Sequence, residues 1–163
     1  MNKEQQKRVA AIHDLSGFGK CSLTVALPIL SAAGIETSAL PTAILSTHTG
    51  GILGYTYRDL TEDMRPFMKH WKELDIRFDA VYSGFIGSAG QIAAIRRFYE
   101  RFRGADTVVL CDPVMGDTDT GVFVRPDIPQ FMKEHFLNGL ADMTKPNQFE
   151  LCLLYTSPSP RDA

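Results

Sequence analysis

Residues 108–117, with the sequence V-V-L-C-D-P-V-M-G-D, constrain the fold of this chain more than any other segment. The first four have the apolar and β-branched character of a buried strand. The segment after them contains two carboxylates five positions apart, Asp112 and Asp117. In an open α/β sheet the ligand crevice lies outside the carboxyl ends of the strands. The sequence therefore predicts a strand that ends in negative charge at a crevice, where a metal-bound phosphate could be handled.

Strand-like and helix-like segments alternate along most of the chain. Apolar runs predict strands at residues 9–13, 35–40, 79–83, 107–111 and 142–145. Helical spacing predicts helices at residues 22–33, 61–74, 88–102 and 128–137, with Thr61 and Ser88 as N-caps and Gly34 as a stop. This alternation is typical of βαβ units, so we expect an α/β fold with a largely parallel sheet flanked by helices.

Length, charge and cysteine content narrow the class of protein. The 163 residues suffice for one domain with a core, and the net charge of −2 gives no reason to expect a nucleic acid partner. No apolar run approaches the roughly 18 residues that span a bilayer, so we expect no membrane partner. Cys21, Cys111 and Cys152 are odd in number and lack metal-ligand spacing, which favours reduced thiols and a cytoplasmic location.

The last nine residues, 155–163, break the pattern. Their sequence, Y-T-S-P-S-P-R-D-A, has two prolines within three positions, which prevents a helix from continuing, and leaves little to bury. We interpret this segment as a non-native tail and residues 1–154 as the folded part. A natural, disordered C-terminus is the alternative.

The glycine-rich segment 16–22, S-G-F-G-K-C-S, resembles a phosphate-binding loop only superficially. Asp14 occupies the place of the first glycine of a P-loop, and Cys21 that of the Ser or Thr that binds magnesium. We interpret the segment as a strand-to-helix turn in which Asp14 faces the crevice and accepts hydrogen bonds from a polar ligand. The alternative is that Asp14 caps the turn.

Two further polar segments are candidates for ligand binding. Residues 46–51, S-T-H-T-G-G, could hydrogen-bond a hydroxylated or ring-nitrogen ligand, although His48 could equally be a structural histidine. In residues 145–150, K-P-N-Q-F-E, Asn147 and Glu150 fall on one face of a predicted helix, where they could contact a phosphate oxygen and a hydrated magnesium ion. A capping box formed by the same two residues is equally compatible with the spacing. We assign no role to His13, His70 and His135.

The combination of D-P-V-M-G-D with P-N-x-x-E about thirty residues later resembles the vitamin kinases of the ribokinase superfamily. The closest resemblance is to the pyridoxal/pyridoxamine kinases, and residues 81–88 (V-Y-S-G-F-I-G-S) and 46–50 (S-T-H-T-G) support it. The resemblance covers about residues 8–154. It implies a ribokinase-like fold and the ATP-dependent phosphorylation of the 5′-hydroxymethyl group of pyridoxal, pyridoxamine or pyridoxine, with ATP and Mg²⁺ as cofactors.

The resemblance also implies roles for particular residues. Those on the nucleotide side are Asp112, Lys145, Asn147 and Glu150, of which Asp112 and Glu150 would bind the metal. Those on the vitamer side are Asp14, Thr49 and Gly50. By the same resemblance, we expect a homodimer at full length.

Two departures from the family pattern qualify this expectation. The family has a serine that contacts the pyridine ring where this chain has Asp14, and the hydroxymethylpyrimidine kinases of thiamin synthesis have a comparable opening, so such a kinase is one alternative. No G-x-G-D turn, which carries the family's catalytic base, follows Glu150. We therefore expect that the fold is incomplete at the C-terminus and that the chain alone is inactive. From a different class, a non-catalytic small-molecule-binding module is the other alternative.

Overall fold

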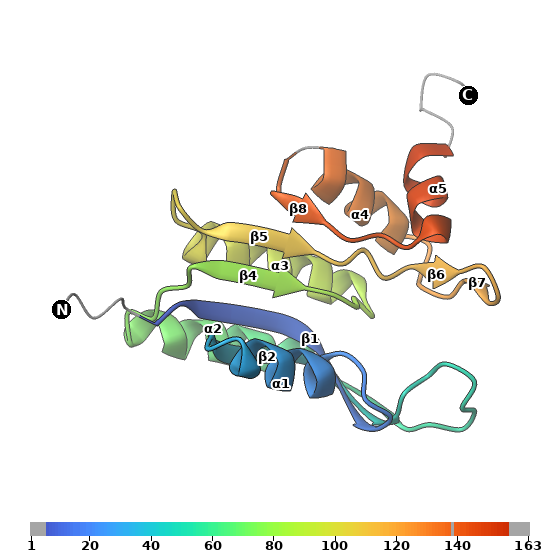
Figure 1. Ribbon diagram of the computed structural model, residues 1–163, viewed down its shortest axis with the longest axis horizontal. Coiled ribbons are helices and arrows are strands. Elements are labelled where there is room, and N and C mark those ends of the chain that lie inside the picture. Colours follow the sequence, from blue (N-terminus) through green and yellow to red (C-terminus); the bar gives the residue numbers. More distant parts are fainter. Residues whose placement is uncertain (1–5, 138, 157–163) are drawn as a thin grey trace.

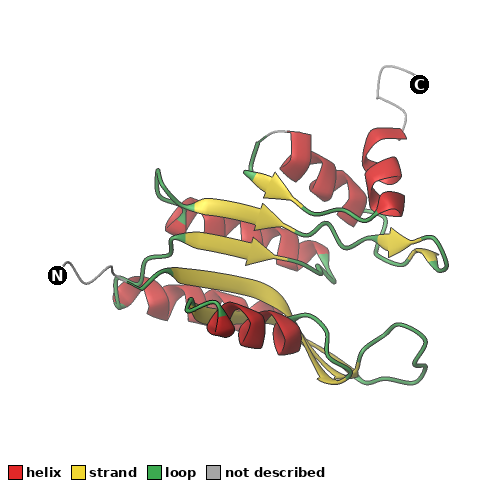
Figure 2. Ribbon diagram, in the orientation of Figure 1, coloured by secondary structure: helices red, strands yellow, loops and turns green. Residues whose placement is uncertain are grey.

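The computed structural model describes residues 6–137 and 139–156 of the chain as a sheet with helices on both faces (Figures 1 and 2). The main sheet consists of six strands: β1 (Arg8–Phe18), β2 (Glu36–Thr47), β3 (Tyr57–Asp59), β4 (Ala80–Ser83), β5 (Val108–Cys111) and β8 (Met143–Thr144). Two further strands, β6 (Gly116–Asp117) and β7 (Gly121–Val122), form a separate hairpin. The helices are α1 (Leu23–Ala32), α2 (Thr61–Glu73), α3 (Ala89–Phe102), α4 (Ile128–Leu137) and α5 (Gln148–Thr156).

The strands of the main sheet follow the order β3-β2-β1-β4-β5-β8. All neighbouring pairs are parallel except β2 and β3. The sequence-based expectation of a largely parallel α/β sheet is confirmed. Because parallel strands end at one edge, the residues that follow β4, β5 and β8 meet there with the second half of β1.

The hydrophobic core lies between the sheet and the helices α2, α3 and α4, while α1 covers the opposite face of β1 and β2 (Figure 1). Phe98 on α3 is fully buried and stacks on Phe102, with ring centroids 4.6 Å apart. Trp71 from α2 and Phe78 complete this aromatic group. Burial of one such side chain contributes about 1.5–3 kcal/mol, so the aromatic group fixes α2 and α3 on the sheet.

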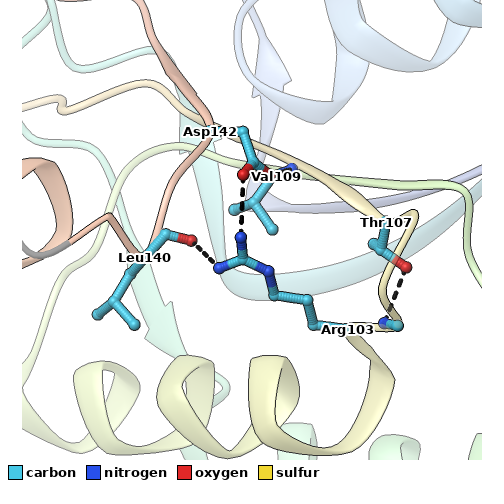
Figure 3. A network of polar contacts seen from close by, with 6 residues as sticks. Arg103, Thr107, Val109, Leu140 and Asp142 are labelled. Atoms are coloured by element: carbon cyan, nitrogen blue, oxygen red, sulfur yellow. Dashed lines mark hydrogen bonds and ion pairs between the residues drawn. The ribbon is translucent and has the colours of Figure 1, made fainter.

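A polar network fixes the short edge strand β8 against β5 (Figure 3). Asp142 accepts a hydrogen bond from the backbone N–H of Val109 and, with its other carboxylate oxygen, one from Arg103. Arg103 also donates to the backbone carbonyl of Leu140. The arginine at the end of α3 thus holds the segment that leads into β8 and, beyond it, the start of α5.

The helix boundaries agree with the sequence-based expectations except at one cap. Ser88 caps α3 by accepting a hydrogen bond from the N–H of Gln91, and Gly34 follows α1 with a positive φ of 77°. Thr61 is not the N-cap of α2: it is the first helical residue, and its N–H donates to the Asp59 carboxylate at 2.7 Å. That carboxylate satisfies the exposed helix N–H in place of the expected threonine hydroxyl.

The periodicity of the sequence predicted two strands shorter than they are and did not indicate three others. β1 and β2 run five and seven residues beyond the predicted 9–13 and 35–40, and β3 and the β6–β7 hairpin were not expected. At the other end, α5 includes the first two residues of the segment interpreted as a tail, while residues 157–163 lie outside the described residues. Among the described helices, none is long and apolar enough to cross a bilayer.

Candidate active site

Two cavities lie at the edge where the parallel strands end. The first, of about 260 Å³, is lined by residues of β1, the loop before α1, the end of β2 and the segments after β4 and β5. The second, of about 320 Å³, lies beside the β6–β7 hairpin and the start of α5. The residues that line both cavities are Asp112, Val114, Phe123 and Lys145. The site therefore has two compartments with a common wall.

Asp14 contributes a buried carboxylate to the first cavity. One of its oxygens accepts a hydrogen bond from Ser22 at 2.6 Å, and the other accepts one from Ser16 at 3.2 Å. Ser22 is the N-cap of α1, yet its hydroxyl makes no capping bond to that helix, and its φ of 52° is unusual for a residue with a side chain. The expectation that Asp14 faces the crevice is confirmed. Through its hydrogen bond to Ser22, the Asp14 side chain also ties the start of α1 to β1.

His13 lines the same cavity, although no role was expected for it from the sequence. A register shift in the pairing of β1 with β2 lies between His13 and Leu15, and such a bulge redirects side chains. Adjacent residues of a regular strand point to opposite faces, whereas here His13 and Asp14 both reach the cavity. The ring of His13 packs edge-on against Tyr82, with centroids 4.3 Å apart. Burial lowers its pKa to about 4, opposed in part by a hydrogen bond with the Tyr82 backbone, so the imidazole is neutral at physiological pH.

The loop after β2 is held by His48. Its Nδ1 accepts a hydrogen bond from the backbone N–H of Gly50, and the backbone N–H of His48 donates to the carbonyl of Phe18. A Cβ on Gly50 would collide with the imidazole ring, which explains the glycine at that position. Thr49 and His48 line the first cavity, whereas Gly50 acts through the turn behind them. The structural interpretation of His48 is thus confirmed, and His48 also forms part of the cavity wall.

Asp112 lies between the two cavities, directly after β5. Burial raises the pKa of its carboxyl group, and the Lys145 ammonium, 3.9 Å away, opposes this rise. The hydroxyl of Tyr82 lies 3.5 Å from the same carboxylate oxygen, and burial together with this charge raises the pKa of Tyr82 to about 12. Lys145 is well exposed and contributes the one lysine or arginine side chain among the described residues that line the two cavities.

Asn147 and Glu150 form a capping box at the start of α5. The Asn147 side chain accepts from the N–H of Glu150 at 2.8 Å, and the Glu150 carboxylate accepts from the N–H of Asn147 at 2.9 Å. The second carboxylate oxygen of Glu150 accepts from the N–H of Met115, and the Asn147 amide donates to the carbonyl of Gly116. The capping-box interpretation is confirmed, and the same pair anchors the loop after β5 to α5.

Asp117 lines the second cavity, and its carboxylate also holds the β6–β7 hairpin. One of its carboxylate oxygens accepts hydrogen bonds from the backbone of Asp119 and from the backbone and hydroxyl of Thr120. The backbone and hydroxyl of Thr120 lower the pKa of this exposed carboxyl group. Asp117 thus stabilises the turn between β6 and β7, and Asp112 remains the carboxylate of the D-P-V-M-G-D segment at the common wall.

The donor set suits a hydrated magnesium ion better than a protein cage. The described residues contain no group of three or more His, Cys, Asp or Glu side chains arranged to hold a metal. Mg²⁺ often binds through one or two carboxylates, with water and phosphate oxygens completing its shell. Asp112 offers such a carboxylate, whereas both oxygens of Glu150 already accept backbone N–H groups. Glu150 would therefore reach a magnesium ion through water.

Curated sequences similar to this chain include several pyridoxal kinases. The chain is 35% identical over 147 residues to the pyridoxal kinase of Rubrobacter xylanophilus, covering 88% of this chain and 50% of that protein. It is 36% identical over 132 residues to that of Granulibacter bethesdensis, covering 75% of this chain and 44% of that protein. The chain spans about half the length of these relatives. No protein-family model matches the sequence.

Solved structures similar to this chain include pyridoxal kinases and a protein assigned as a phosphomethylpyrimidine kinase. A Bacteroides thetaiotaomicron protein, provisionally assigned as a phosphomethylpyrimidine kinase and crystallised with pyridoxal, has a TM-score of 0.85 at 40% identity and covers 98% of this chain and 55% of its own. Pyridoxal kinase from Lactobacillus plantarum has a TM-score of 0.80 at 29% identity, covering 95% of this chain and 56% of its own. The Leishmania donovani enzyme in complex with ADP and pyridoxamine has a TM-score of 0.80 at 25% identity, covering 93% of this chain and 53% of its own.

Proposed function

This chain belongs to the pyridoxal kinase family of ribokinase-like proteins, and we propose that it serves the ATP-dependent phosphorylation of the 5′-hydroxymethyl group of a B6 vitamer. The observation that carries the proposal is the pair of cavities with a common wall at Asp112 and Lys145. Phosphoryl transfer depends mainly on positioning and charge stabilisation. Two adjoining compartments, one for the acceptor alcohol and one for the nucleotide, provide that positioning.

We assign the first cavity to the vitamer. Asp14 presents hydrogen-bond acceptors there, and Thr49 supplies a hydroxyl from the loop after β2. Gly50 contributes through its hydrogen bond to His48, which shapes that loop. The second cavity is assigned to the nucleotide, with Asn147 and Glu150 fixing its floor and Lys145 offering a cation to the phosphates.

A magnesium ion would be held by Asp112 directly and by Glu150 through water. When bound, it supplies positive charge that offsets the charge of the transferring phosphoryl group. The G-x-G-D aspartate, the expected general base, does not occur in the 163 residues. No residue of this chain is therefore assigned as the base.

Two further features of the proposal concern the whole protein. We expect a homodimer. Four exposed apolar side chains on the second halves of β1 and β2 and on the loop after β2 support it, namely Phe18, Ile44, Leu53 and Tyr55. We expect a cytoplasmic location, and the absence of disulfides among the described cysteines is compatible with it.

Equilibrium binding to the 163-residue chain tests the assignment. Pyridoxal and Mg–ADP should bind together, each with little effect on the affinity for the other, as measured by isothermal titration calorimetry. Competition between the two ligands, or vitamer binding without any nucleotide binding, would overturn the two-compartment kinase and favour a non-catalytic binding module. A preference for 4-amino-5-hydroxymethyl-2-methylpyrimidine over pyridoxal would favour the hydroxymethylpyrimidine kinase instead.

A further inference from the structure

The wall of the first cavity formed by β1 has an unusual distribution of hydrogen-bonding groups. The Asp14 carboxylate is buried and accepts hydrogen bonds from the hydroxyls of Ser16 and Ser22. No ion pair joins Asp14 to a cation within 4 Å among the residues described. A buried carboxylate normally has a cationic partner or a metal, because the charged form is otherwise poorly solvated. The free protein leaves this charge to be balanced.

The imidazole of His13, the residue before Asp14, is the second polar group of this wall. Nε2 of His13 is buried and has no hydrogen-bond partner among the described residues. The ring is neutral and hydrogen-bonds to the Tyr82 backbone. With Nδ1 as the donor to that backbone, Nε2 carries a lone pair. An orphaned polar atom in a cavity wall costs about 1–3 kcal/mol unless a ligand satisfies it.

These two groups have the same polarity. Both residues line the cavity and both carry hydrogen-bond acceptors, and the register of β1 against β2 shifts between His13 and Leu15. The strained φ of Ser22 and its diverted hydroxyl indicate that the surroundings of Asp14 are arranged at some cost to α1. A ligand that fits this wall must donate hydrogen bonds to it.

We propose that this wall selects the vitamer with its ring nitrogen protonated, so that the pyridinium N–H donates to Asp14 and a second polar hydrogen of the ligand donates to Nε2 of His13. The inference rests on the proposed function and adds the ionisation state of the substrate to it. The pyridinium supplies the missing positive charge beside Asp14. A neutral aromatic ring of the same shape leaves the negative charge of Asp14 unbalanced, although both of its oxygens keep their hydrogen bonds to Ser16 and Ser22.

Other ionisable groups face the same region, and the measurement must separate them from Asp14. Those that line the cavity come from the loop before α1, the loop after β2, β4 and the segments after β5 and β8: Cys21, His48, Tyr82, Asp112 and Lys145. The pKa of Tyr57 on β3 is raised mainly by burial and by the charge of Asp59, and the charge of Asp14 adds to this rise.

The test follows the ultraviolet spectrum of pyridoxine bound to the full chain as pH is varied, because ring protonation changes the absorbance. In the wild-type protein, we expect the ring pKa of bound pyridoxine to rise by at least one unit over that of free pyridoxine, since a neighbouring carboxylate favours the cation. Asp14→Asn should abolish the rise and weaken pyridoxine at least tenfold. Asp63→Asn, an exposed acid on α2, serves as the matched control and should change neither quantity.

A second arm tests His13 and keeps the inference falsifiable if a variant folds poorly. The carbocyclic analogue of pyridoxine, in which C–H replaces the ring nitrogen, should bind the wild-type chain at least tenfold more weakly than pyridoxine. His13→Gln should weaken pyridoxine several-fold while retaining the raised ring pKa, because Asp14 remains. An unshifted ring pKa, or equal binding of pyridoxine and its carbocyclic analogue, overturns the inference alone. Failure to bind any B6 vitamer overturns the proposed function together with it.

Discussion

The substitution Glu150→Gln tests how the loop after β5 is held beside the second cavity. Glu150 is 3% exposed, and its two carboxylate oxygens accept from the backbone N–H groups of Met115 and Asn147, at 3.0 and 2.9 Å. Glutamine keeps the shape but has one acceptor oxygen and an NH₂ group in place of the second oxygen. One of the two backbone N–H groups then faces a donor.

The expected change in the free energy of unfolding follows from the loss of one of the two hydrogen bonds that the Glu150 carboxylate accepts. A hydrogen bond to a charged group contributes about 1.5–3 kcal/mol, and a buried donor left unsatisfied costs about 1–3 kcal/mol. These two ranges describe largely the same loss, so they are not added. We expect Glu150→Gln to lower the free energy of unfolding by about 2–3 kcal/mol, with the largest local effect on the N–H of Met115.

Urea denaturation followed by the fluorescence of the single tryptophan, Trp71, gives the global value, and hydrogen exchange of residues 112–123 gives the local one. The control is Glu73→Gln, which removes an exposed ion pair with Lys69 and should cost about 0.5 kcal/mol or less. Equal destabilisation by the two substitutions, with no faster exchange of the Met115 amide, would refute the anchoring role of Glu150.

Three further outcomes follow from other parts of the site. The pKa of His13 is lowered to about 4 in the folded chain, whereas the unfolded chain binds the same proton near pH 6.5. The free energy of unfolding should therefore fall as pH decreases from about 6.5 to 4. His13→Gln should lack this part of the fall in urea titrations. Gly84→Ala would place a Cβ against the imidazole of His13 and should lower the urea midpoint by the equivalent of about 1–3 kcal/mol, whereas Gly104→Ala meets only an ordinary contact and should change it little. Asp112→Asn should weaken the binding of Mg–ADP and its dependence on magnesium concentration, with pyridoxine affinity unchanged by calorimetry; a loss confined to pyridoxine would contradict the placement of Asp112 on the nucleotide side.

Local periodicity was sufficient to predict most of the architecture. The helix at residues 128–137 and the strand ending at Cys111 were predicted to within one residue, because apolar spacing and flanking polar residues define them in the sequence. The β6–β7 hairpin was missed, although D-T-D-T-G at residues 117–121 is a turn signal and Gly121 has a positive φ of 68°. Strand β3 has three residues and no apolar run, so it depends on pairing with β2, which local sequence does not show.

The site was predictable where it follows strand ends and unpredictable where it depends on register. Asp14 and Asp112 were identified because each follows a buried apolar run. His13 was missed, since a regular strand would point it away from Asp14, and the bulge that redirects it arises from pairing with β2. Asn147 and Glu150 could not be assigned between capping and ligand binding from their spacing, and the structure shows that capping, at least, is satisfied.

The charges around the two cavities give a physical reason why both ligands should bring positive charge. The acidic residues that line one or both cavities are Asp14, Asp112, Asp117 and Glu150, and Lys145 is the one lysine or arginine among the described lining residues. Backbone N–H groups stabilise Glu150, while Lys145 partly offsets Asp112. A triphosphate entering beside Asp112 would meet net repulsion unless it arrived with a divalent cation, and Asp14 lacks a cation of its own. We therefore expect the same imbalance to favour a magnesium-bound nucleotide on one side of the common wall and a protonated vitamer on the other.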